Sequence, residues 1–274
     1  MPVDTGARAA ESRVAFEPRV ALASLSGASD AAWARAGAAY VGAAFLGGIA
    51  LDGPTRDAAR AMVERGREEF LPPDPVRFVD EQLDALSETS LQAGVNVRTV
   101  NLDPLARLGA VCADHGAIVE INAHCRQDEM CRVGAGESLL ADAGRLCEQV
   151  RTAREAGAPV GVKVRTETGV DLPGLAARVE RAGADLIHVD AMDSEPVVGR
   201  VADATGLFVV ANNGVRDRET AHEYLAHGAD AVSVGRPSDD PAVLSRVRAA
   251  TDEWFAGRTQ RRDRPNPALQ GGSR

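Results

Sequence analysis

Eight short apolar runs alternate with alanine-rich helical stretches along this 274-residue chain, and this alternation limits the possible folds more than any other feature. The apolar runs have the length and composition of buried strands. A strand followed by a helix is the repeating unit of a parallel sheet. The expected strands are Val20–Ser24, Tyr40–Phe45, Asn96–Val100, Ile118–Asn122, Val160–Val164, Leu186–Val189, Phe208–Ala211 and Ala231–Val234.

Eight such units predict a single α/β domain, a closed (β/α)8 barrel of the TIM type. A doubly wound open sheet usually has about five or six strands and a GxGxxG turn after the first strand, whereas this turn reads SLSGAS. The barrel is expected over residues 19–256, between a flank at 1–18 and a disordered tail rich in Arg, Pro and Gly at 257–274. The expected helices include Ala31–Ala39, Arg56–Glu69, Pro75–Ala93, Leu139–Ala156, Leu172–Ala182, Arg218–His227 and Pro241–Phe255.

Charge and cysteine usage narrow the class of protein. Forty acidic against 31 basic residues give a net charge of -9, which disfavours polyanion binding by the surface as a whole but permits a local basic groove. No signal peptide is expected, because the N-terminus has no positively charged start followed by a long apolar run. No membrane span is expected either, because the most apolar stretch, Tyr40–Leu51, is far shorter than the roughly 20 residues of a span. The four cysteines form no CxxC pair, which favours a protein of the reducing cytoplasm.

Lys163 is the only lysine of the chain, since the other 30 basic residues are arginines. An acidic, lysine-poor and alanine-rich composition is typical of a salt-loaded cytoplasm or a GC-rich genome. Lys163 lies within an expected strand, where the barrel interior would bury its stem, and a buried ammonium is costly without an anion. We therefore expect either a bound anion beside it or a carboxylate such as Glu120; a structural ion pair is the alternative.

In barrels of this kind the reactive groups lie at the carboxyl ends of the strands. Glycines at the ends of the seventh and eighth strands predict a phosphate cradle of backbone N–H groups, with ordinary turns as the alternative. The polar residues at these ends are Glu120, Asn122, His124 and Cys125 after the fourth strand, Lys163 and Arg165 on the fifth, His188 and Asp190 on the sixth, Asn212, Asn213 and Gly214 after the seventh, and Gly235 and Arg236 after the eighth.

Cys125 and His188 each have a functional and a structural interpretation. The Cys125 thiol would donate a proton or, as a thiolate, attack a substrate; the alternative is an inert buried cysteine. His188 taken alone is typical of a hydrogen-bonded core histidine. A zinc site of His124, Cys125 and Cys131 is a weak alternative, because their spacing matches no usual pair of ligands.

Taken together, these motifs resemble the flavin-dependent tRNA-dihydrouridine synthases, in a short, archaeal-type form. IVEINAHCRQDEMCRVGAGESLL resembles the fourth-strand segment of that family, in which an asparagine precedes a catalytic cysteine by three residues. The resemblance covers about residues 20–250 in the order that the barrel requires. The further matching segments are VALASLSGASDAAW for the first strand and VGVKVRTETG, LIHVDAMDS, VVANNGV and AVSVGRPS for the last four strands.

The resemblance implies FMN as cofactor and NADPH (or NADH) as its reductant. It implies that the flavin delivers hydride to C6 of a uracil ring while Cys125 protonates C5. Cys125, Lys163 and His188 would then be the catalytic residues. The implied cofactor contacts are Asn122, Lys163 and His188 at the ring, Ser24 and Leu25 on its other side, and Asn213, Gly214, Gly235 and Arg236 at the phosphate.

Two departures from the family leave alternatives open. His124 and Arg126 flank the cysteine where the family usually has Gly and Pro, and the helical tRNA-binding domain of the bacterial enzymes does not follow the expected barrel. We expect uridine in tRNA as the substrate. The alternatives are a free pyrimidine, as in the dihydroorotate and dihydropyrimidine dehydrogenases, and a barrel without redox chemistry that binds a phosphorylated metabolite.

Overall fold

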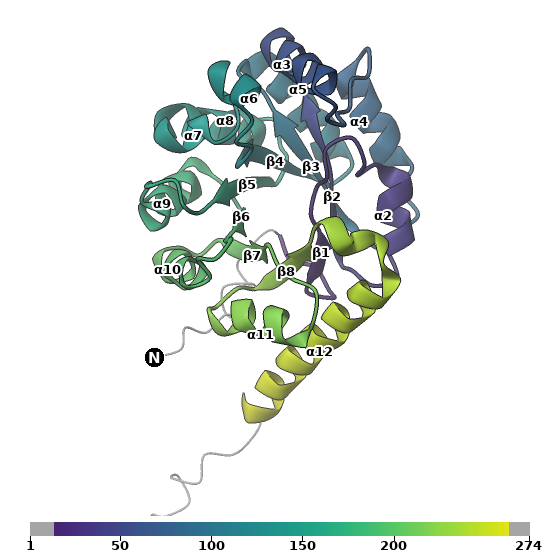
Figure 1. Ribbon diagram of the computed structural model, residues 1–274, viewed down its shortest axis with the longest axis vertical. Helices are drawn as coiled ribbons and strands as arrows, with labels where there is room; N and C mark the ends of the chain where they lie inside the picture. The colour runs from purple at the N-terminus through teal and green to yellow at the C-terminus, as the bar shows by residue number, and fades with distance from the viewer. Residues whose placement is uncertain (1–13, 263–274) are drawn as a thin grey trace, which may run out of the picture.

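Eight parallel strands close into one barrel in the computed structural model, which describes residues 14–262 and the side chains of residues 14–257. Each strand pairs with its neighbours in the sequence, and the last strand pairs with the first (Figure 1). The predicted (β/α)8 fold is therefore confirmed. The strands are β1 (Val20–Leu22), β2 (Ala43–Ala50), β3 (Gln92–Arg98), β4 (Ile118–Ala123), β5 (Val160–Arg165), β6 (Leu186–Asp190), β7 (Phe208–Asn212) and β8 (Ala231–Val234).

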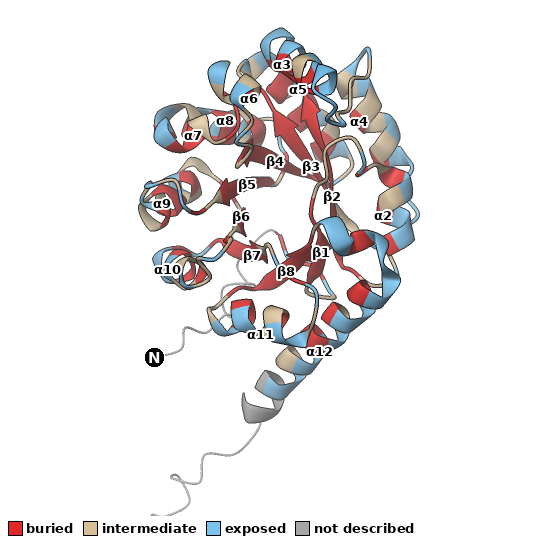
Figure 2. Cartoon of the chain, in the orientation of Figure 1, coloured by how far each residue is buried: buried red, intermediate tan, exposed pale blue. Residues whose placement is uncertain are grey.

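Helices surround the barrel and pack their apolar faces on the strands, so that buried residues lie on the inner side of the helical layer (Figure 2). None of the helices described is both long and apolar enough to cross a membrane. The helices are α2 (Ala31–Gly37), α3 (Gly53–Glu64), α4 (Pro75–Asp84), α5 (Leu102–Asp114), α6 (Asp128–Arg132), α7 (Ser138–Ala141), α8 (Ala143–Glu155), α9 (Leu172–Ala182), α10 (Pro196–Ala204), α11 (Arg218–Ala226) and α12 (Pro241–Arg262), with a 3-10 turn, η1 (Arg236–Asp239).

The bounds of several elements differ from the sequence-based expectation, and the ends of α4 and α12 are two examples. The helix expected through Ala93 ends at Asp84, because the hydroxyls of Ser87 and Thr89 donate to backbone carbonyls one turn back and stabilise turns instead. Helix α12 continues to Arg262, so the expected tail starts too early. The remaining tail residues, 263–274, and most of the expected flank, 1–13, lie outside the described residues.

An apolar plug closes the barrel at the starts of the strands. Val14 and Phe16, which precede β1, are buried in one apolar cluster with the side chains at the starts of the strands. These side chains include Phe208, the first residue of β7, and Ile118, the first residue of β4. The Phe16 and Phe208 rings lie 5.2 Å apart between centroids. This end is therefore filled by packing, and the space for a ligand is left at the carboxyl ends of the strands.

We expect Phe16→Ala to lower the free energy of unfolding by about 3 kcal/mol, because it leaves a cavity in the plug. Urea unfolding followed by circular dichroism measures the change. Val63→Ala, which truncates an exposed side chain on α3, is the control and should change stability by less than about 0.5 kcal/mol. Equal stabilities of the Phe16 variant and the parent would contradict the plug.

Candidate active site

Two adjoining cavities open at the carboxyl ends of the strands. The large cavity, of about 990 Å³, has the size of a cofactor site, and the small cavity has about 280 Å³. They share seven lining residues: Ser24, Ser26, Arg67, His124, Asp190, Asn213 and Arg236. Of the predicted site residues, Ser24, Leu25, Lys163, Asn213, Gly214, Gly235 and Arg236 line the large cavity, and Asn122 and Cys125 line the small one.

The cavity walls are basic although the chain as a whole is acidic. Seven cationic side chains face only two carboxylates, Glu68 and Asp190. Such a concentration of one sign of charge in a cleft attracts anionic ligands. The cations are Lys163, Arg67, Arg98, Arg126, Arg165, Arg216 and Arg236.

The loops after β7 and β8 present free backbone donors to the large cavity. Within the described part of the chain, the N–H groups of Gly214, Gly235 and Arg236 donate no hydrogen bond. A Cβ atom built on Gly214 or Gly235 would meet no atom within 4 Å, so open space lies in front of both glycines. Donors without partners beside open space fit a bound phosphate group.

The Lys163 side chain is 1% exposed and lines the large cavity. Its ammonium makes no hydrogen bond or ion pair with any residue that the structure describes. Burial lowers its pKa, against the opposing charges of Glu120 and Asp190. Glu120 is not its direct partner, so of the two expectations stated for this lysine the geometry favours a bound anion.

A buried polar chain of Asn122, Asn96, Glu120, His188 and Ser233 crosses the barrel and reaches the walls of both cavities. Asn122 donates to Asn96 Oδ1 at 2.8 Å, and Asn96 donates to Glu120 Oε2 at 2.6 Å. His188 Nδ1 lies 2.7 Å from Glu120 Oε1, and its Nε2 lies 2.7 Å from Ser233 Oγ. A carboxylate only accepts, so we assign the proton to Nδ1 and the acceptor role to Nε2.

His188 is thus placed below the cavities and lines neither of them. It is fully buried, with its ring 5.3 Å from that of Phe45 between centroids. Burial and the nearby charge of Lys163 lower its pKa, so the imidazole is neutral. Both ring nitrogens are occupied within the protein, which differs from the predicted contact with a cofactor and matches the alternative of a hydrogen-bonded core histidine.

This neutral histidine predicts a loss of stability in mild acid. Its pKa is lower in the folded chain than the value of about 6.5 in the unfolded chain, so the unfolded state binds more protons as the pH falls below that value. The contribution is present above the unfolded-chain pKa of about 6.5 and is lost progressively as the pH falls below it, so we expect the free energy of unfolding to decrease between about pH 6.5 and 5.5. Urea unfolding of the parent and of His188→Gln measures it; equal pH dependences would contradict it.

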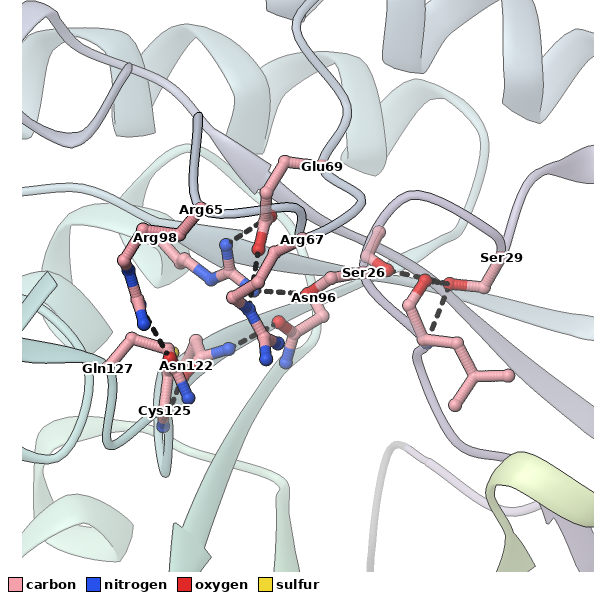
Figure 3. A network of polar contacts seen from close by, with 12 residues as sticks. Ser26, Ser29, Arg65, Arg67, Glu69, Asn96, Arg98, Asn122, Cys125 and Gln127 are labelled. Atoms are coloured by element: carbon pink, nitrogen blue, oxygen red, sulfur yellow. Dashed lines mark hydrogen bonds and ion pairs between the residues drawn. The ribbon is translucent and has the colours of Figure 1, made fainter. Parts of the chain in front are cut away.

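Asn122 fixes the backbone that carries Cys125 (Figure 3). Its side-chain oxygen accepts from the N–H groups of His124 at 3.3 Å and Cys125 at 3.0 Å. The Cys125 carbonyl in turn accepts from Glu137 N–H at 2.9 Å. Gly136 has a φ of +62°, and a Cβ there would lie 2.2 Å from the Cys125 carbonyl oxygen, so this position requires glycine. The half-buried cysteine is therefore held at the small cavity.

His124, Cys125 and Cys131 do not gather as metal ligands. In the part of the chain that the structure describes, the one group of three side chains with ligand atoms within 4.8 Å of one another is Asp80, Asp84 and His115. This group is on the outer surface, with both aspartates exposed. The zinc alternative drawn from the cysteine loop therefore has no support from the geometry.

Arg98 is a site residue that the sequence analysis missed. It extends from the end of β3, is 3% exposed and lines the small cavity. Its guanidinium donates to Glu69 Oε2 at 2.6 Å and also to Ser26 Oγ, and these contacts join the end of β3 to the loops after α3 and β1 (Figure 3). The strand-end rule would have found it if β3 had been expected to end at Arg98 instead of Val100.

Residues 79–263 match the model of the dihydrouridine synthase family. Uncharacterized protein MJ0144 of Methanocaldococcus jannaschii is 29% identical over 234 residues, which cover 81% of this chain and 89% of that protein. FabK of Thermotoga maritima has a TM-score of 0.54 at 19% identity over 80% of this chain and 58% of its own. Thiamine phosphate pyrophosphorylase of Pyrococcus furiosus has a TM-score of 0.52 at 13% identity, covering 86% and 96% of the two chains. These two structures share the barrel fold with this chain.

Proposed function

The chain belongs to the dihydrouridine synthase family of flavin-dependent oxidoreductases, and on this basis we propose that it reduces the C5–C6 double bond of uridine in tRNA. FMN is the proposed cofactor, and NADPH or NADH is the reductant. The observation that carries the proposal is the buried Lys163 ammonium, which has no partner among the described residues and faces a cavity large enough for a cofactor.

The large cavity offers what FMN requires. The free N–H groups of Gly214, Gly235 and Arg236 would hold its phosphate, with Asn213 on the same loop. Lys163 would face the electron-rich edge of the ring, and Ser24 and Leu25 would line its other side. When bound, the flavin supplies the hydride.

The side chains of the small cavity would then orient and protonate the substrate. Its volume of about 280 Å³ suits one heterocyclic ring taken out of its stack. The Cys125 thiol would donate its proton to C5 of that ring, and the arginines of the same cavity would stabilise the thiolate that remains. Asn122 would hold the cysteine backbone in place.

Cations at the cavity mouth support a nucleic acid as the substrate. Arg67, Arg126 and Arg236 are exposed there. Guanidinium groups beside an opening provide contacts for phosphates of the RNA backbone. The acidic remainder of the surface would confine the RNA to this face.

The test has two parts, one on the purified protein and one on a strain of the source organism from which the gene has been deleted. We expect a yellow protein that binds about one FMN per chain, and loss of dihydrouridine from the tRNA of the deletion strain by mass spectrometry. Unchanged tRNA, together with reduction of UMP, uracil or orotate by the purified enzyme, would instead show a free pyrimidine as the substrate. A protein that is colourless and cannot be reconstituted with FMN would refute flavin chemistry altogether.

A further inference from the structure

His124 lies where the large and small cavities meet, and it lines both. It follows β4 directly, and its backbone N–H donates to Asn122 Oδ1. The same oxygen holds the N–H of Cys125, so one amide side chain fixes the backbone of both residues. The imidazole is therefore attached to a segment of the cavity wall whose backbone is held by hydrogen bonds to Asn122.

The Nδ1 atom of His124 is buried and has no hydrogen-bond partner in the described part of the chain. Buried polar atoms in proteins are rarely left without a partner, because the lost hydrogen bond to water is not replaced. No residue of the cavity wall satisfies this atom. A ligand in the cavity is the partner that the geometry leaves for it.

Positive charges surround the ring and keep it neutral. Burial lowers its pKa well below the usual value, and the positive charges of Lys163, Arg98 and Arg165 lower it further. A neutral imidazole has one N–H donor and one nitrogen lone pair, whereas an imidazolium only donates. His124 is therefore able to donate to one ligand atom and accept from another.

We propose that His124 is a specificity-determining residue that hydrogen-bonds the polar edge of the pyrimidine ring of the substrate. This inference rests on the proposed function and deepens it. The edge of a uracil ring alternates carbonyl oxygens, which accept, with a ring N–H, which donates, and a neutral imidazole complements both kinds of group. Since His124 borders both cavities, the pyrimidine ring that it would hold lies between the large cavity and Cys125.

Variants of His124 test the contact by kinetics. With FMN-loaded enzyme reduced beforehand and mixed with an unmodified tRNA transcript, His124→Ala should raise the concentration for half-maximal reoxidation about tenfold. His124→Gln, which still donates and accepts, should recover most of this loss. FMN affinity and the rate of reduction by NADPH should stay within about twofold of the parent. His227→Gln, on the outer side of the barrel at the end of α11, is the matched control and should behave as the parent.

Histidine NMR provides a readout that does not depend on turnover. The chain has five histidines, so the ¹⁵N imidazole signals of selectively labelled FMN-loaded protein can be assigned by the Gln variants. Adding UMP until the flavin absorption spectrum changes should move the His124 signals and leave those of His227 in place. A changed flavin spectrum with unmoved His124 signals would overturn the inference.

The remaining outcomes separate this inference from the proposed function. If His124→Ala weakens FMN binding and leaves the dependence on tRNA unchanged, His124 contacts the cofactor and not the substrate, and the inference is wrong. If the parent binds FMN but tRNA does not reoxidise it, the tRNA proposal fails, while the shift of the His124 signals by UMP still decides the contact with a pyrimidine ring.

Discussion

Replacing Lys163 with methionine is expected to slow the reduction of bound FMN by NADPH by about 100-fold or more. The ammonium is buried, lines the large cavity and has no partner among the described residues, so its charge is free to stabilise the negative charge that a flavin ring gains on reduction. Fixed charges in a site that excludes water are worth about two to three orders of magnitude in rate. Stopped-flow absorbance in the visible flavin band measures the change.

Two comparisons make this test specific. Lys163→Arg keeps the positive charge on a different shape and should recover part of the rate. The flavin content of the methionine variant should stay close to that of the parent, since in the proposed site the free N–H groups after β7 and β8 would hold the phosphate independently of the lysine. Reduction of the methionine variant at the parent rate would refute the electrostatic role.

Cys125→Ala should reduce the rate at which tRNA reoxidises the reduced enzyme by about 1000-fold, because the proposed proton donor to C5 is lost and general acids contribute about two to four orders of magnitude. The variant should still bind FMN and accept electrons from NADPH at the parent rate, since Cys125 lines the small cavity and not the large one. Single-turnover absorbance with an unmodified tRNA transcript separates the two half-reactions.

Cys131→Ala is the matched control for this experiment. Cys131 belongs to the same loop, and its Sγ contacts the Cys125 carbonyl oxygen at 3.6 Å, but it lines neither cavity. It should retain nearly the full rate. Equal losses in the two variants would show that the loop conformation matters and not the thiol of Cys125, and a Cys125 variant as fast as the parent would exclude the thiol as the acid.

The architecture was predictable because alternation of buried strands and helices is a local property of the sequence. The bounds of β8 and α9 agree with the expected ones, since each is set off by short loops. The bounds of β2 do not agree. The strand expected at Tyr40–Phe45 is observed at Ala43–Ala50, because its pairing with β3 continues through Gly47 and Gly48 with one irregularity.

The sequence predicts which residues lie at the carboxyl ends of the strands. It does not predict how far each side chain extends from the barrel interior toward a cavity. Lys163 and His188 are neighbours in the sheet register, so the sequence gives no reason to separate them. The long lysine side chain reaches the large cavity, whereas the shorter histidine ends among Glu120 and Ser233 in the floor. The contacts of Arg98 join the end of β3 to the loops after β1 and α3. A local sequence pattern does not predict such contacts between distant segments.

The buried polar chain from Asn122 to Ser233 connects the cysteine loop after β4 with the loop after β7, although the two loops are far apart in the sequence. At one end Asn122 holds the backbone of Cys125 in the loop after β4. At the other end Ser233 contacts Asn212, which precedes the loop of Asn213 and Gly214. Each member of this chain is hydrogen-bonded to the next, so a substitution at one member leaves a buried polar partner unsatisfied. We therefore expect substitutions on the side of Cys125 to be energetically coupled to substitutions on the side of Asn212.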